Sequence, residues 1–125
     1  ISGDSIFLAF VESGTTNKPN VMQYTVSGWS RIGGTEAYNQ DISGLSLAVH
    51  NLTPFIAFLD PSVSYAATVR WYNSNNAAWE TLGTAGFVAT NLPPLINVTS
   101  SGVPYIGYAN ADGLAAVKRY SITGD

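Results

Sequence analysis

The sequence predicts an all-β fold built from small antiparallel sheets, and three observations support this prediction. Similar segments recur every 48 to 50 residues, at 7–10 (FLAF), 55–58 (FIAF) and 105–108 (YIGY). A fixed period of this length is typical of a repeat architecture. These segments are rich in aromatic and β-branched residues, and no window has the apolar spacing of an amphipathic helix. Clusters of turn-forming residues separate them, such as residues 73–76 (NSNN).

Each repeat is predicted to contain four short strands. The first strand is residues 45–49 (LSLAV), which residues 95–98 (LINV) echo, and the second is the segment named above. The third strand ends in a tyrosine and the fourth begins at a tryptophan; these residues are Tyr24, Tyr72, Tyr120, Trp29 and Trp79. The strands fall into a partial repeat at about 5–34, a full repeat at about 45–84 and a partial repeat at about 94–121.

The second strands indicate how the sheets are arranged. They are apolar at consecutive positions, and a strand of this kind is covered on both faces. Each small sheet is therefore expected to lie between two others, with Ala9, Ala57 and Gly107 at one equivalent position where neighbours approach closely. Radially repeated four-stranded sheets meet these demands, and such sheets are the blades of a β-propeller. A β-sandwich is the alternative, but it does not predict the repeat with Trp and Tyr in register.

The repeat also resembles known propeller families. An apolar hairpin, a strand ending in Tyr, a polar turn and a Trp, as in residues 72–79 (YNSNNAAW), are similar to a kelch-type blade. The glycine doublet that usually closes the second kelch strand is absent. The chain looks more like the divergent repeats of secreted propeller proteins, of the form P-Y-x-A-Y-x-D, then a strand ending in Tyr, then W-x-x-x-G. This resemblance covers almost all 125 residues and implies a propeller fold.

The strand count gives about two and a half four-stranded blades per chain. A propeller ring contains at least about four blades. We therefore expect missing sequence of the same polypeptide, or other subunits, to complete the ring. The short-chain fucose-binding propeller lectins build a ring in this second way, although their Arg, Glu and Trp sugar-contact pattern is not reproduced in this sequence.

Composition restricts the classes of partner. Only 10% of residues are charged, the net charge is −3, and the five basic residues do not form a cluster. Nucleic-acid binding draws on a clustered cationic surface, so we expect no nucleic-acid partner. No apolar run reaches the roughly 20 residues of a membrane helix, so no membrane span is expected. The low charge indicates a surface that is largely covered, by further repeats, partner subunits or glycans.

Two N-x-S/T sequons favour an extracellular, secreted glycoprotein, whereas the absence of cysteine does not decide the compartment. The N-x-S/T sequons at Asn51 and Asn97 are candidate glycosylation sites, although such triplets are also common by chance in a chain rich in Asn, Ser and Thr. Asn97 is the weaker candidate because it falls inside a predicted strand. The chain has no cysteine, which excludes disulfides and thiolate metal sites.

No residue pattern predicts catalysis, a metal site or a cofactor. His50 is the single histidine, and the sequence has no G-x-S-x-G elbow that would supply a serine nucleophile beside it. The eight acids include no D-x-D-x-D-G loop and no sialidase-type box. We therefore expect a protein that is not an enzyme.

Six residues are candidates for ligand binding. Glu12, Asp60 and Asn110 occupy the same exit from the second strand, where they either cap a turn or bind sugar hydroxyls or a cation. Tyr38 and Phe87 follow the fourth strands, where they either lie on the same face of the propeller as these three residues or pack between blades. Trp71 has no aromatic counterpart in the other repeats, which makes it a candidate partner contact. The repeated Trp and Tyr residues are assigned to packing between blades.

These observations predict a non-catalytic extracellular binding module, lectin-like or protein-binding. Its expected partners are a carbohydrate or an extracellular protein, together with further copies or repeats of itself. One alternative is a structural subunit of an extracellular coat or filament, which the incomplete blade count suggests. A second alternative is a fragment of a propeller glycoside hydrolase or lyase, which would need acids from missing blades.

Overall fold

A computed structural model describes residues 5–11, 17–90, 92–110 and 112–120. Over these residues the chain forms ten strands and two single-turn 3-10 helices, which confirms the all-β prediction. The elements are β1 Ile6–Val11, β2 Pro19–Thr25, β3 Gly28–Arg31, η1 Ile32–Gly34, β4 Ser43–His50, β5 Thr53–Asp60, η2 Pro61–Val63, β6 Ala66–Asn73, β7 Ala78–Thr81, β8 Leu95–Val98, β9 Pro104–Ala109 and β10 Ala115–Arg119. Neither helix of this described part is long or apolar enough to cross a membrane.

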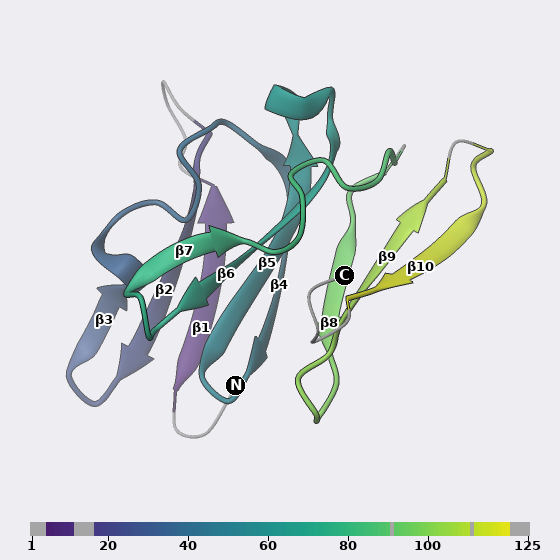
Figure 1. The fold of residues 1–125 in the computed structure, drawn as a ribbon. Coiled ribbons are helices and arrows are strands. Elements are labelled where there is room, and N and C mark those ends of the chain that lie inside the picture. Colours follow the sequence, from purple (N-terminus) through teal and green to yellow (C-terminus); the bar gives the residue numbers. More distant parts are fainter. Residues whose placement is uncertain (1–4, 12–16, 91, 111, 121–125) are drawn as a thin grey trace.

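The strands form three antiparallel sheets (Figure 1). Sheet 1 has the order β1-β2-β3, sheet 2 the order β4-β5-β6-β7, and sheet 3 the order β8-β9-β10. Each sheet pairs strands that follow one another in the chain, because short turns connect them and antiparallel pairing needs no crossover. The predicted antiparallel arrangement is therefore confirmed.

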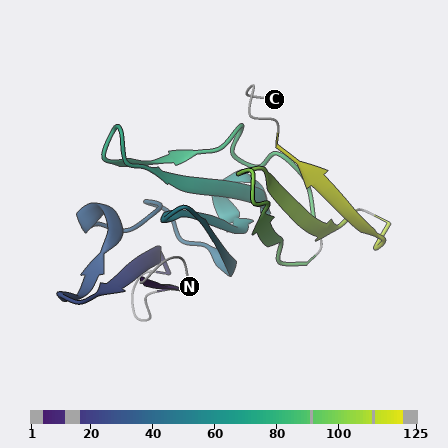
Figure 2. The ribbon, with the colours of Figure 1, turned by 90° about the horizontal axis from the view of Figure 1, so that it is seen from below.

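Sheet 2 lies between the other two sheets (Figure 2). Side chains of β5 alternate between the two neighbours: Ile56 and Phe58 enter an apolar cluster with sheet 1, whereas Phe55 and Ala57 enter one with sheet 3. Both faces of β5 are consequently buried, as its continuous apolar sequence predicts. The sheets meet at β4, which contacts both β1 of sheet 1 and β8 of sheet 3.

The prediction that every second strand is covered on both faces is wrong for β1. Its side chains alternate between partly buried and exposed positions, and Leu8 is 49% exposed where the equivalent Ile56 is 0% exposed. The physical reason is the position of sheet 1 at the end of the stack, where no described segment covers its outer face. Trp29 and Tyr24 lie on this outer face, pack against each other and stay largely exposed, contrary to the packing assigned to them.

The glycine that ends the W-x-x-x-G segment allows adjacent sheets to approach. Gly33 has φ +83°, and a Cβ there would lie 3.1 Å from the ring of Trp79 in the next sheet. Gly83 has φ +70°, and a Cβ there would lie 2.9 Å from Tyr120. The indole N–H of Trp79 also donates to the Ile32 carbonyl at 3.1 Å. Trp79 and Tyr120 therefore pack between sheets, as the sequence predicts.

Candidate functional site

Asp60, the last residue of β5, is the centre of a buried hydrogen-bond network. Its Oδ1 accepts from the backbone N–H of Ser62 at 3.1 Å and from the Ser62 hydroxyl at 2.6 Å. Its Oδ2 accepts from the Tyr38 hydroxyl at 2.8 Å and from the Thr68 hydroxyl at 2.9 Å. The residue is 0% exposed and caps η2. Asp60 therefore fixes the η2 turn and Tyr38, and it has no surface for direct contact with a ligand.

Tyr38 lies in the segment that links sheet 1 to sheet 2. Its ring packs at a tilt on Phe58, with 5.1 Å between ring centroids. The guanidinium carbon of Arg70 lies 5.1 Å from the Tyr38 ring centroid, a cation–π geometry. Burial raises the pKa of Tyr38, so the phenol stays neutral at physiological pH and donates to Asp60. The ring thus presents a fixed aromatic surface beside a cation.

Arg70 joins the middle of β6 to the segment that follows sheet 1. Its Nε–H donates to the Ala37 carbonyl at 3.1 Å, Nη1 to the Thr81 hydroxyl at 2.8 Å and Nη2 to the Trp79 carbonyl at 3.1 Å. A guanidinium has five N–H donors, so two remain without a partner among the described residues. Burial lowers the pKa of Arg70, but an arginine remains protonated at neutral pH.

Tyr38 and Arg70 line a cleft of about 380 Å³ between sheet 2 and the segment that follows sheet 1. The lining combines two aromatic side chains, a cation, a carboxylate, an amide and a hydroxyl; its residues are Gly33, Thr35, Glu36, Tyr38, Asn39, Arg70, Ala77, Ala78 and Trp79. Trp79 is held from two directions, by its indole bond to Ile32 and by edge-on contact with Tyr72 at 5.6 Å. Rigid aromatic walls with a few converging polar groups are typical of small-molecule sites.

Glu36 gives the cleft a negative charge beside the Arg70 cation. Hydrogen bonds lower the pKa of Glu36 below 4.5, first from its own backbone N–H and then from the Thr35 hydroxyl at 2.9 Å. Lys18 Nζ lies 4.0 Å from Glu36 Oε1 and adds to this effect. Glu36 is therefore ionised at neutral pH and accepts hydrogen bonds only.

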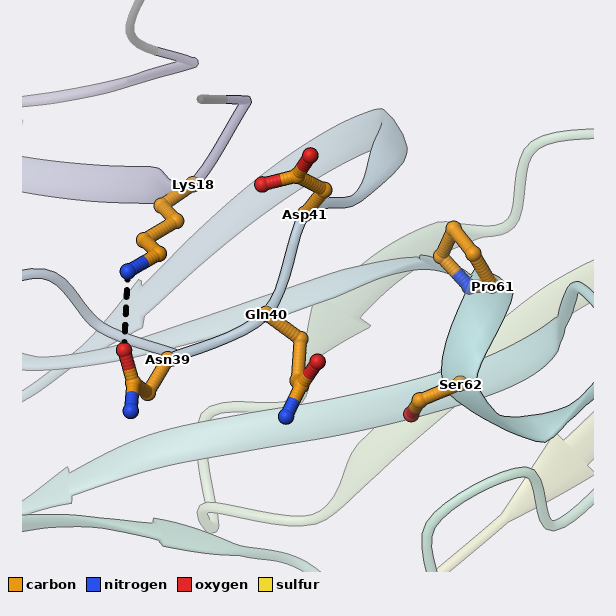
Figure 3. A pocket seen from close by; sticks show the side chains of 6 residues that line it. All are labelled: Lys18, Asn39, Gln40, Asp41, Pro61 and Ser62. Atoms are coloured by element: carbon orange, nitrogen blue, oxygen red, sulfur yellow. Dashed lines mark hydrogen bonds between the residues drawn. The ribbon is translucent and has the colours of Figure 1, made fainter. Parts of the chain in front are cut away.

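A second, more open pocket of about 440 Å³ adjoins the cleft and shares Asn39 with it (Figure 3). Lys18 Nζ donates to Asn39 Oδ1 at 2.9 Å on one side, and Pro61 and Ser62 of η2 form the other side. Gln40 and Asp41 complete the lining. This pocket has no aromatic wall, so it extends the polar surface of the cleft without a stacking platform.

Two charged residues of the cleft, Glu36 and Arg70, differ from their counterparts in the other repeats. The bonds from Ala37 N–H to Pro19 and from Phe87 N–H to Ala67 align residue 37 with residue 87. The position of Glu36 is then Gly86 in the next repeat. The position of Arg70 is Met22 in sheet 1 and Lys118 in sheet 3. Trp79 and Gly33, which also pack between the sheets, recur as Trp29 and Gly83, whereas Glu36 does not recur and Arg70 recurs only as a cation in sheet 3.

The structure separates the other predicted site residues. Phe87 packs edge-on against Tyr120 at 5.3 Å, and Trp71 stacks on Phe55 at 6.2 Å, both against the cluster between sheets 2 and 3. Asn110 caps the β9–β10 turn, where its Oδ1 accepts from the N–H groups of Asp112 and Leu114 at 3.0 Å each. Of the six candidates, only Tyr38 lines the cleft. Glu12 lies outside the described residues.

Both sequon asparagines are exposed. Asn51 follows β4 in a turn with φ 47°, and its Nδ2 lies 3.2 Å from Nε2 of His50. Asn97 is in β8, and its Oδ1 accepts from the Val98 N–H at 2.8 Å.

Sequence reasoning missed Glu36 and Arg70 as site residues and assigned Trp79 to packing alone. The available signal was position 70, where a cation stands between the apolar residues Val69 and Trp71 in a strand predicted to be covered. Arg70, Glu36 and Trp79 share one cleft, although no sequence motif joins them, because two come from strands of sheet 2 and Glu36 comes from the segment that follows sheet 1. Across the described residues, no three His, Asp or Glu side chains gather closely enough to hold a metal ion.

Comparison with known protein families finds no family that matches the chain, and comparison with curated proteins finds no relative.

Proposed function

We propose that this chain is a β-propeller segment that binds carbohydrate, without catalysis, outside the cell. The observation that carries the proposal is the cleft between sheet 2 and the segment that follows sheet 1, where Trp79 and Tyr38 stand beside the oppositely charged Arg70 and Glu36. A sugar presents an apolar ring face and several hydroxyls. Aromatic side chains pack against such a face, and charged groups form strong hydrogen bonds with hydroxyls. The predicted resemblance to secreted propeller proteins supports the same assignment.

The propeller architecture is part of the proposal. Sheet 2 is covered on both broad faces, the sheets approach at the strands β1, β4 and β8, and equivalent glycines lie against aromatic rings of the next sheet. These contacts repeat from sheet to sheet, as the blades of a radial array require. Completion of the ring by further repeats or by other subunits follows from the same arrangement.

The extracellular setting has separate support. Both sequon asparagines are exposed, so each is accessible to glycosylation in a cell that performs it. The low content of charged residues agrees with a surface that glycans or neighbours cover.

Binding is tested with a glycan array followed by calorimetry on the sugars that the array identifies. The informative variants are Glu36→Gln, which keeps the shape of the side chain, and Arg70→Met, which installs the residue found in sheet 1. Each removes a charge-assisted hydrogen bond, and we expect about a tenfold loss of affinity for each change.

Glu80→Gln is the matched control. Glu80 is a half-buried glutamate of β7 whose carboxylate accepts from Asn73 and Asn76, and it does not line the cleft. We expect unchanged affinity for this variant. The proposal is wrong if the array shows no sugar binding, or if Glu36→Gln and Glu80→Gln behave alike. Circular dichroism of every variant separates loss of binding from loss of fold.

One observation favours a second candidate function, a structural subunit of an extracellular coat or filament. The outer faces of sheets 1 and 3 carry exposed apolar side chains, including Leu8, Trp29, Leu95 and Val117. Large apolar patches of this kind mark interaction surfaces. Long assemblies seen by light scattering or electron microscopy would support this candidate.

A further inference from the structure

The outer face of sheet 1 is the counterpart of a face that is buried elsewhere in the chain. In sheet 2, Ile56 and Phe58 pack against sheet 1, and both are 0% exposed. The repeat aligns them with Leu8 and Phe10 of β1, which are exposed on the outer face. Sheet 1 thus presents the surface that packs onto a preceding sheet.

The outer face of sheet 3 is the counterpart of the opposite surface. Ala57 and Val69 of sheet 2 pack against sheet 3, and both are 0% exposed. The strand pairing aligns Val69 with Val117, which is 70% exposed. This face contains a shallow groove of about 420 Å³. The residues that line the groove include Leu95, Gly107, Ala109 and Val117. Sheet 3 thus presents the surface that receives a following sheet.

We propose that the outer face of sheet 3 binds the outer face of sheet 1 of a second copy of this chain. The contact continues an interface that the chain already forms twice, between sheets 1 and 2 and between sheets 2 and 3. Its two halves are different surfaces, so it is a heterologous, head-to-tail contact that closes into a ring or extends as a filament.

The charge distribution agrees with this occupant. The register places one charged side chain on each outer face, Arg31 on sheet 1 and Arg119 on sheet 3. An apolar contact with so little charge gains from high salt. We therefore expect association to persist or strengthen as salt is raised.

This inference rests on the stacked, propeller-like arrangement of the proposed function, but its failure is distinguishable from that of carbohydrate binding. The candidate cleft lies within one chain and needs no second copy. A monomer that binds sugar would overturn the assembly alone, whereas an assembly that binds no sugar would overturn the lectin function alone.

The test measures mass by light scattering and native mass spectrometry, at micromolar to tens of micromolar protein. We expect multiples of the 13.2 kDa chain for the wild type. Leu8→Glu damages only the sheet 1 face and Val117→Glu only the sheet 3 face, so each variant alone is expected to be monomeric. Val26→Glu is the control, because Val26 is fully exposed and lies in the β2–β3 turn, outside both outer faces. We expect this variant to assemble to the same mass as the wild type.

The decisive measurement mixes the two monomeric variants. Leu8→Glu keeps an intact sheet 3 face and Val117→Glu an intact sheet 1 face, so a mixture is expected to form a one-to-one dimer that grows no further. Leu8→Ser and Val117→Ser repeat the experiment if a glutamate variant loses its circular dichroism spectrum. A monomeric wild type, variants that assemble as the wild type does, or a mixture that stays monomeric would overturn the proposal.

Discussion

At the scale of single residues, Asp60 shows why a carboxylate at a loop is ambiguous in sequence. The sequence predicts a ligand-binding residue at this position, yet Asp60 accepts four hydrogen bonds within the protein and is fully buried. A buried carboxylate of this kind is stable only while its hydrogen bonds are intact. Its contribution to binding is indirect, because it holds Tyr38 at the wall of the cleft.

We expect Asp60→Ala to lower the free energy of unfolding by about 3 kcal/mol, since it leaves several buried donors without an acceptor. Chemical denaturation measures this change. Asp41→Ala is the control, because Asp41 accepts one bond, from the Asn17 N–H at 3.2 Å, at an exposed site. The control should change stability by less than about 0.5 kcal/mol. Equal effects of the two variants would contradict the structural function of Asp60.

The candidate site was only partly predictable from sequence. Tyr38 and Asp60 were recognised because they flank predicted strands, but the sequence does not show that the Tyr38 hydroxyl donates to Asp60 at the end of β5. Glu36 and Arg70 gave weaker signals, because they are 34 residues apart and belong to different repeats. A cleft between one sheet and the segment that follows another depends on how the sheets stack, and no local pattern contains that information.

At the scale of secondary-structure elements, the loop after each fourth strand determines how closely two sheets pack. Gly33 and Gly34 are adjacent and both have positive φ, +83° and +73°. Only Gly33 faces the next sheet, where Trp79 and Tyr72 lie within 3.2 Å of a would-be Cβ. A Cβ at Gly34 would meet nothing within 4 Å. A comparison of alanine substitutions at the two glycines therefore separates the cost of backbone strain from the cost of crowding between the sheets.

Gly34→Ala is expected to cost about 1–2 kcal/mol of unfolding free energy, the penalty of a left-handed alanine. Gly33→Ala carries the same penalty and also pushes against Trp79, so it should cost more. Chemical denaturation gives both values, and tryptophan fluorescence of the folded protein, recorded with Trp29 and Trp71 replaced by Phe in both variants, reports any shift of the Trp79 ring. If the two variants are equally stable, Gly33 does not determine the distance between the sheets.

The strands themselves were predictable because their signals are local. Turn clusters such as residues 73–76 end one strand and start the next, and the register follows from the hairpins. The exposure of β1 was not predictable, because its apolar sequence is nearly that of β5. Whether a neighbour covers a face is a property of the stack and not of the strand.

At the scale of the whole molecule, stability is expected to be graded from the centre of the stack to its ends. β5 is an internal strand of the four-stranded sheet and is buried on both faces. β10 is an edge strand of sheet 3, and its side chains are mostly exposed. Amides in well-covered central strands open only with global unfolding, whereas edge strands open locally.

We therefore expect amide hydrogen exchange of a dilute, monomeric sample to be slowest in peptides covering 53–60 and much faster in those covering 115–119. The comparison is internal, since both segments are β-strands of one chain under one condition. If the outer faces pair between copies, raising the protein concentration should slow exchange in β9 and β10 and leave β5 unchanged, because β5 is already covered. Equal protection of β5 and β10 in the monomer would contradict a stack whose centre alone is covered on both sides.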